Sequence, residues 1–208
     1  RTAPLEQNQT MLTSKPRILI IDDNPAIHED FRKLFADQGG NTAAFDALES
    51  SIFGDAAPAS HVQPFDLNFA SQGQEGLEKV KAALAAGRPY TLAFMDVRMP
   101  PGWDGVETIE HLWQVDPELQ VVICTAYSDY SWDDMRQRLG DSDSLLVLKK
   151  PFDTVEVLQI AHTLTLKWSL QREARGQHAR LETEVRHRTA ELQKAMELAE
   201  AGRQQYRT

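Results

Sequence analysis

The stretch "RILIIDDNPAIHED", residues 17–30, begins as an apolar run and stops at two adjacent aspartates. The run is short and rich in β-branched side chains, which predicts a strand that is covered on both faces. Asn24 and Pro25 then open a predicted helix. Because adjacent carboxylates repel and are costly to bury, Asp22 and Asp23 predict either a positively charged partner or a place on the surface.

Composition limits the kind of protein. The chain has 208 residues, of which 41% are hydrophobic and 25% charged, as is usual for a globular protein with a sizeable core. Its formal net charge of −9 argues against a general nucleic-acid binder. Residues 1–15 lack the apolar core of a signal peptide and read as a flexible lead-in, and no apolar run is long enough for membrane insertion. The single cysteine, Cys124, is expected to be a buried thiol, so we expect a cytoplasmic protein.

Strand and helix patterns alternate from residue 16 to 168, which we interpret as one domain. Helical patterns, such as those over 75–87 and 105–115, separate apolar strand candidates. Because parallel neighbours need crossover connections, the alternation predicts an α/β fold with a doubly wound parallel sheet. The five predicted strands are 17–22, 65–70, 90–96, 119–126 and 144–151.

Polar residues stand where four of these strands end. In doubly wound sheets, the side chains that do chemistry gather beyond the carboxyl ends of the strands. The sequence therefore predicts a site at this edge of the sheet. Its candidate residues are Asp22 and Asp23 after the first strand, Asp96 at the third, Thr125 at the fourth, and Lys149 and Lys150 at the fifth.

Two segments depart from the alternation. Residues 41–64 form an insertion where a link of about 2–6 residues is usual, and apolar residues at helical spacing favour a short amphipathic helix there. The insertion covers its own apolar face against the domain, docks a partner or is disordered, and the sequence leaves these readings open.

The other segment is helical from Asp153 to the end. Its first turns carry one apolar stripe, which we expect to pack on the sheet. Over 169–208 the spacing alternates between threes and fours, which favours a marginal two-stranded coiled coil and a homodimer, with a solvated single helix as the alternative. The repeat has a period of seven residues. Its predicted seam, called the seven-residue seam for that period, comprises Ala174, His178, Leu181, Val185, Arg188, Leu192, Ala195 and Ala199.

Four motifs lie at the predicted strand ends. In their order along residues 16–168, they resemble the response-regulator receiver (CheY-like) domain of two-component signalling. The resemblance implies a flavodoxin-like sheet with strand order 2-1-3-4-5 and a phosphoacceptor function. The motifs are "IDDNP" (21–25), "FMDVRMPPGWDG" (94–105), "VVICTAY" (121–127) and "LKKPF" (148–152).

The resemblance implies that Asp96 accepts a phosphoryl group from the phosphohistidine of a histidine kinase. It also implies a Mg²⁺ ion held by Asp23, Asp96 and the backbone carbonyl of Arg98, with Asp22 helping to position the ion. Three converging carboxylates would repel strongly without a cation, and oxygen ligands suit a hard, hydrated ion. The metal is then the positive partner that the first stretch predicts.

Two further roles follow from the resemblance. Lys150 would contact the phosphoryl oxygens, and Thr125 would turn its hydroxyl towards the new phosphate. The family places its lysine directly before a proline, which favours Lys150 over Lys149, and alternation along the strand turns Lys149 to the other face.

The sequence also departs from the family pattern. Val147 stands where receivers commonly carry Tyr or Phe, so the usual coupling to the switch threonine is not expected unless Tyr127 or Tyr130 substitutes. The loop "MPPGWDG" (99–105) is one residue longer than usual, and we expect it to be remodelled. Arg98 and Tyr127 occupy positions that tune phosphoryl lifetime in this family, and their bulk predicts slow self-dephosphorylation.

Other functions fit less well. A Mg²⁺-dependent phosphatase of the haloacid-dehalogenase type is the alternative, but that class needs a second Asp two residues after the first, where this chain has Arg98. A DNA-binding factor is disfavoured because the 40 residues after Trp168 read as one helix. We therefore expect a signalling module with no catalysis beyond its own phosphorylation and dephosphorylation, and with its output domain in another part of the parent protein.

Overall fold

The computed structural model describes residues 15–36, 65–126, 132–140 and 142–205. The chain divides into two compact units, residues 1–168 and 169–208, and each is considered by itself. The insertion 41–64 and both Tyr127 and Tyr130 lie outside the described residues.

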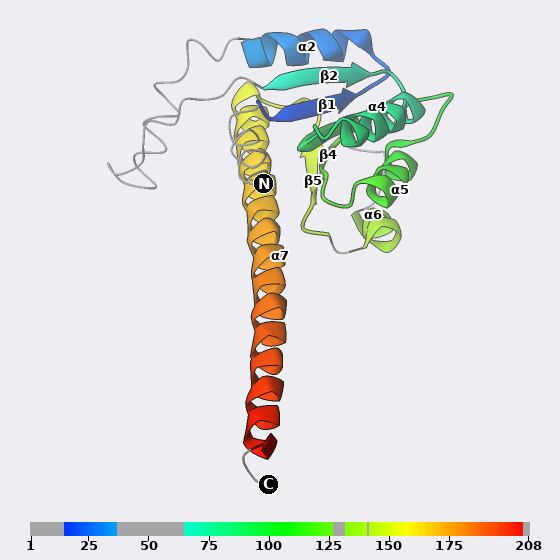
Figure 1. Cartoon of the computed structure of the whole chain (residues 1–208). Helices are drawn as coiled ribbons and strands as arrows, with labels where there is room; N and C mark the ends of the chain where they lie inside the picture. Colours follow the sequence, from blue (N-terminus) through cyan, green and yellow to red (C-terminus); the bar gives the residue numbers. More distant parts are fainter. Residues whose placement is uncertain (1–14, 37–64, 127–131, 141, 206–208) are drawn as a thin grey trace. The chain divides into compact units, whose positions relative to one another are not determined.

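The first unit is built on a five-stranded sheet in which every pair of neighbours is parallel (Figure 1). The strand order is β2-β1-β3-β4-β5, which confirms the predicted α/β fold and its order 2-1-3-4-5. The predicted strand bounds differ from the observed ones by at most two residues, so that Lys150 follows the last strand instead of lying in it. The strands are β1 (Arg17–Ile21), β2 (Asp66–Ala70), β3 (Leu92–Asp96), β4 (Gln120–Thr125) and β5 (Leu145–Lys149).

Helices cover both faces of this sheet, because successive strand residues point to opposite sides. In β1, Leu19 and Ile21 belong to one buried cluster, which includes residues of α4, α5 and α6. Ile18 and Ile20 belong to a second cluster, which includes residues of α2 and of the first turns of α7. The described helices are α2 (Pro25–Ala36), α4 (Gly73–Ala85), α5 (Gly105–Val115), α6 (Trp132–Leu139) and α7 (Thr154–Gln205).

The start of α5 lies directly against the end of β3. The Gly105 amide donates a hydrogen bond of 2.8 Å to the Val97 carbonyl. A Cβ atom at Gly105 would lie 2.4 Å from the Asp96 carbonyl oxygen, which is too close for any residue other than glycine in this arrangement. Asp104 caps the helix by accepting a hydrogen bond from the Glu107 amide. This close approach holds the strand end that carries Asp96.

The second unit is the continuation of α7. Every described side chain from Gln177 to Met196 is exposed. Within the described part of the chain, we find no helix that combines the length and the apolar character needed to cross a membrane.

Candidate functional site

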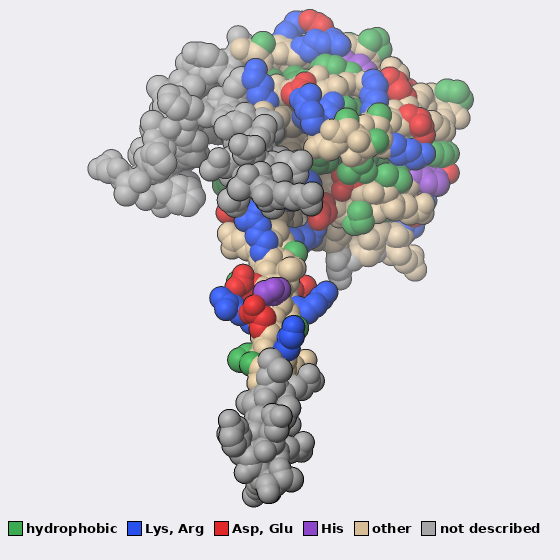
Figure 2. Space-filling view, in the orientation of Figure 1, with side chains coloured by type: hydrophobic (Ala, Val, Ile, Leu, Met, Phe, Trp, Pro, Cys, Tyr) green, Lys and Arg blue, Asp and Glu red, His purple; other side chains and the backbone are tan. Residues whose placement is uncertain are grey.

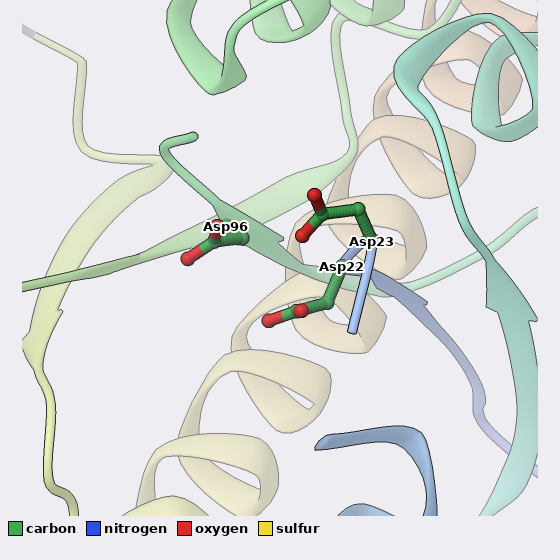
Figure 3. A group of neighbouring side chains, drawn as sticks. All are labelled: Asp22, Asp23 and Asp96. Carbon is green, nitrogen blue, oxygen red and sulfur yellow. The ribbon is translucent and has the colours of Figure 1, made fainter. Parts of the chain in front are cut away.

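Three carboxylates gather at the carboxyl edge of the sheet. Asp22 and Asp23 follow β1, and Asp96 ends the neighbouring strand β3 (Figure 3). One oxygen from each carboxylate lies within 4.8 Å of the others. Asp22 is buried and Asp96 is half-buried, whereas Asp23 is exposed. The three aspartates that the sequence predicts around one cation therefore lie close together, and Asp23 is the one that is open to the surface.

Lys150 provides the positive charge of this cluster. Its Nζ lies 2.9 Å from Asp22 Oδ2 and 2.7 Å from Asp96 Oδ1, and it donates a hydrogen bond to each. The lysine follows β5, at the opposite edge of the sheet from β2, and reaches across the end of β4 to these carboxylates. Three carboxylates and one ammonium leave a formal charge of −3 + 1 = −2.

Burial shapes the acidity of this site. It raises the pKa of Asp96, an effect that the hydrogen bond and charge of Lys150 oppose and that the charge of Asp22 reinforces. Burial by itself would lower the pKa of Lys150, but the hydrogen bonds and charges of Asp96 and Asp22 outweigh it and raise that pKa. The ammonium is thus held in its charged form, while the Asp96 carboxyl is less acidic than an exposed one.

Backbone amides orient two of the carboxylates. The Asn24 amide donates to Asp22 Oδ1 at 2.9 Å, and the Arg98 amide donates to Asp96 Oδ2 at 3.2 Å. Asn24 Oδ1 in turn accepts a hydrogen bond from the Ala26 amide at the start of α2. The backbone after β1 therefore holds the Asp22 carboxylate in place, and the backbone after β3 holds that of Asp96. The part of the Arg98 carbonyl as a metal ligand stays a prediction.

Thr125 lies at the end of β4, beside the strand that carries Asp96. Its hydroxyl donates to the Ala126 carbonyl at 2.9 Å, and its own carbonyl accepts from the Lys150 amide at 2.8 Å. The backbone of the predicted switch residue is thus joined to that of the lysine. Val147 is partly buried against the cluster that includes α4, α5 and α6 residues.

Two scaffolding features were not predicted from the sequence. The sequence predicts Gly105 as the first residue of a helix and the last of the motif 94–105, whereas its close approach to the Asp96 carbonyl appears only in three dimensions. The Asp-Gly pair at 104–105 is the sequence signal for this close approach, because it joins a helix-capping residue to the one residue type without a Cβ. In the loop after β3, the Gly102 amide donates to the Met99 carbonyl at 3.1 Å.

The donor set fits a divalent cation. Carboxylate oxygens within 4.8 Å of one another are ligands that Mg²⁺ prefers, and a charge of +2 would balance the −2 of the cluster. A haloacid-dehalogenase arrangement would need an acid two residues after Asp96, and Arg98 stands there with its amide bound to Asp96.

Comparison with known proteins gives the family. The model of the response regulator receiver domain matches residues 60–162, a segment that contains Asp96, Thr125 and Lys150. Sporulation initiation phosphotransferase F of Bacillus subtilis (strain 168) is 33% identical to this chain over 66 residues. The matched segment is 32% of this chain and about half (50%) of the length of this curated relative.

Solved structures share the fold. A CheY-like receiver domain protein from Methanospirillum hungatei JF-1 has a TM-score of 0.54 at 19% identity, covering 76% of this chain and 99% of that one. The signal receiver domain of an HD domain-containing protein from Pseudomonas fluorescens Pf-5 has a TM-score of 0.55 at 20% identity, covering 77% and 94%. At these identities the likeness establishes the shared architecture.

Proposed function

We propose, since this chain carries a response-regulator receiver domain of two-component signalling, that Asp96 is its phosphoryl acceptor. The observation that carries the proposal is the position of Lys150 Nζ, which lies between Asp22 and Asp96 at hydrogen-bonding distance from both. An ammonium so placed lies beside the attacking carboxylate, where it is within reach of the negatively charged oxygens of an incoming phosphoryl group.

The reaction transfers the group from a phosphohistidine to the carboxylate. An Asp96 oxygen forms a bond to phosphorus as the phosphorus–nitrogen bond breaks, and the electron pair stays on the imidazole nitrogen, which takes up a proton from water. Lys150 Nζ keeps its contact with the Asp96 side chain and gains the phosphoryl oxygens as acceptors. Asp22 holds the ammonium in position from the other side.

Asp23, Asp96 and the carbonyl of Arg98 would hold Mg²⁺, with Asp22 beside them. A Mg²⁺ ion bound there would supply positive charge against the spread negative charge of the phosphoryl group. Asp23 is the exposed member of the cluster, so it faces the side from which a donor approaches.

Thr125 would signal the new charge to the rest of the receiver. Its hydroxyl, which donates to the Ala126 carbonyl, turns to a phosphoryl oxygen once that stronger acceptor is present. Because the Thr125 carbonyl accepts a hydrogen bond from the Lys150 amide, rotation of the Thr125 side chain leaves the ends of β4 and β5 joined.

Arg98 and Tyr127 would limit water access to the phosphorylated Asp96, which gives a slow self-dephosphorylation. Replacement of both by alanine (Arg98→Ala with Tyr127→Ala) is expected to shorten the half-life of the phosphorylated state. A half-life that does not fall in the double variant contradicts this role.

The donor would be a histidine kinase of the cytoplasm, in keeping with one buried thiol, Cys124, in the chain. Residues 169–208 would pair with a second copy and carry the phosphorylation state to an output domain of the parent protein.

The test is chemical. The chain is incubated with Mg²⁺ and acetyl phosphate, and the modified residue is located by mass spectrometry and by its lability to hydroxylamine. We expect one phosphoryl group on Asp96, none after Asp96→Asn, and an unchanged yield after Asp30→Asn, which alters an exposed aspartate on α2. A phosphoryl group that survives Asp96→Asn overturns the assignment.

A further inference from the structure

The exposed apolar residues of α7 follow an eleven-residue repeat. Leu170, Leu181 and Leu192 lie eleven residues apart, and so do Ala174, Val185 and Met196. The large members of both rows are 57–65% exposed. The row of Gln177 and Arg188 has the same spacing, so Leu170 and Leu181 are each followed by one small or apolar residue and then by one polar residue.

This spacing distinguishes two ways of winding. Eleven residues in three turns give 3.67 residues per turn, close to the 3.6 of a straight helix, and both rows then stay on one face. In a seven-residue repeat of 3.5 residues per turn, each row would move around the helix by about 50° in every eleven residues. The positions at which the two repeats differ most clearly are Ala195, which the seven-residue seam includes, and Met196, which the eleven-residue rows include.

Charge on this helix favours an identical partner. Residues 169–205 contain seven Lys or Arg and six Glu, so the segment is nearly neutral. Acidic and basic side chains are mixed over its described part, as Figure 2 shows. Arg188, which lies in the polar row, has Glu184 at 3.4 Å and Glu191 at 3.8 Å on its own helix. A mixed, self-neutralised surface selects neither a nucleic acid nor a strongly charged protein.

We propose that a second copy of this chain covers these rows, in a parallel two-stranded coiled coil with an eleven-residue repeat over residues 170–196. The proposal rests on the homodimer of the proposed function and specifies its seam. A two-fold pair presents the same patch on both chains, so each leucine meets its own equivalent over about 40 Å of helix. An isolated helix with all these side chains in water would be marginal, and the pair buries them.

The polar row sets the strength of the pair. Gln177 and Arg188 lie between the leucine layers, and polar residues at such positions specify register at a cost in affinity. We infer that the pair is weak enough for the state of the receiver to shift it.

Single cysteines placed in the full-length chain test the register. Three variants are compared for disulfide formation under mild oxidation: Met196→Cys, Ala195→Cys and Ala190→Cys, the last on the opposite face of the helix. The native Cys124 is 3% exposed, and the unchanged chain serves as the blank. We expect Met196→Cys to cross-link at least fivefold faster than either other variant. Equal or faster cross-linking of Ala195→Cys overturns the eleven-residue seam.

Sedimentation and phosphorylation of the same chains separate this proposal from the function. A monomer at all concentrations, with Asp96 phosphorylated, overturns the coiled coil and leaves the phosphoryl acceptor standing. Cross-linking through Met196→Cys in a chain whose Asp96 takes no phosphoryl group supports the seam and overturns the proposed function.

Discussion

The sheet edge and the second half of α7 depart in opposite ways from the usual distribution of side chains. At the sheet edge, charges are enclosed: the Asp22 side chain is only 5% exposed and the Lys150 side chain 25%. On α7, Leu181 and Leu192 are 64% and 65% exposed. Enclosed charges favour an oppositely charged ligand, whereas regularly spaced apolar side chains favour another protein surface. The sheet edge is therefore suited to a small, charged ligand, and the second half of α7 to a protein surface.

Removal of the enclosed ammonium is expected to have the largest effect. Lys150→Met leaves three carboxylates without a positive charge, so phosphorylation by acetyl phosphate should fall about 100-fold or more. Without Mg²⁺ the free energy of unfolding should fall by roughly 2–3 kcal/mol, a value reduced for the partial exposure of the lysine.

Lys149→Met is the matched control, because it removes the neighbouring ammonium, which is exposed at the end of β5. Denaturant unfolding with and without Mg²⁺ measures both variants. Equal losses in the two would mean that charge near the strand end, and not the bridge to Asp22 and Asp96, is what matters.

A pair of glycine substitutions compares crowding in the two regions. Gly105→Ala places a Cβ 2.4 Å from the Asp96 carbonyl oxygen, and we expect a loss of about 1–3 kcal/mol in unfolding free energy together with impaired phosphorylation. Gly176→Ala, on α7, meets no atom within 4 Å and removes a glycine from a helix interior, so it should stabilise the helix by about 1 kcal/mol. Thermal unfolding measures both, and a tolerated Gly105→Ala would show that α5 can retreat from β3.

An apolar residue added between the exposed rows of α7 tests whether they form the dimer contact. Arg188→Leu extends them across the polar row and should tighten the dimer about tenfold, or 1.4 kcal/mol. Arg186→Leu, which adds the same side chain away from the rows, should leave the dimer unchanged. Sedimentation equilibrium gives both constants, and equal tightening would indicate unspecific association.

A fall in pH should weaken Mg²⁺ binding, by a smaller factor than the about tenfold change in dimer affinity above. Because burial raises the pKa of Asp96, its carboxylate takes up a proton at a higher pH than an exposed aspartate does, and protonation competes with the metal. The sign for folding is opposite: a raised carboxyl pKa makes the ionised form unfavourable in the folded state, so this group adds stability as the pH falls through its folded pKa.

Calorimetric titration of Mg²⁺ between about pH 5 and 8 tests the statement on metal binding. The affinity of the parent chain should fall severalfold towards acid pH. Asp96→Asn should bind more weakly and show a flatter profile. A steeper profile in Asp96→Asn would assign the proton to another member of the cluster.

The local patterns of the sequence determined the strands, the helices and their alternation, since side-chain periodicity and capping residues act over a few neighbours. They also indicated which strand ends carry charge, and the order of the four motifs was enough to predict the family and the sheet order. The eleven-residue spacing on α7 is a property of the sequence as well, although the exposure of Met196 in the structure is what drew attention to it.

Other features depended on tertiary structure. Lys150 and Asp22 are 128 positions apart, and only the packing of the crossover helices brings the ends of their strands together. The contact of Gly105 with the Asp96 carbonyl likewise arises where α5 meets β3, through atoms that no local pattern compares. Periodicity is written along the chain, whereas a site at a sheet edge is made by distant segments whose proximity the whole fold decides.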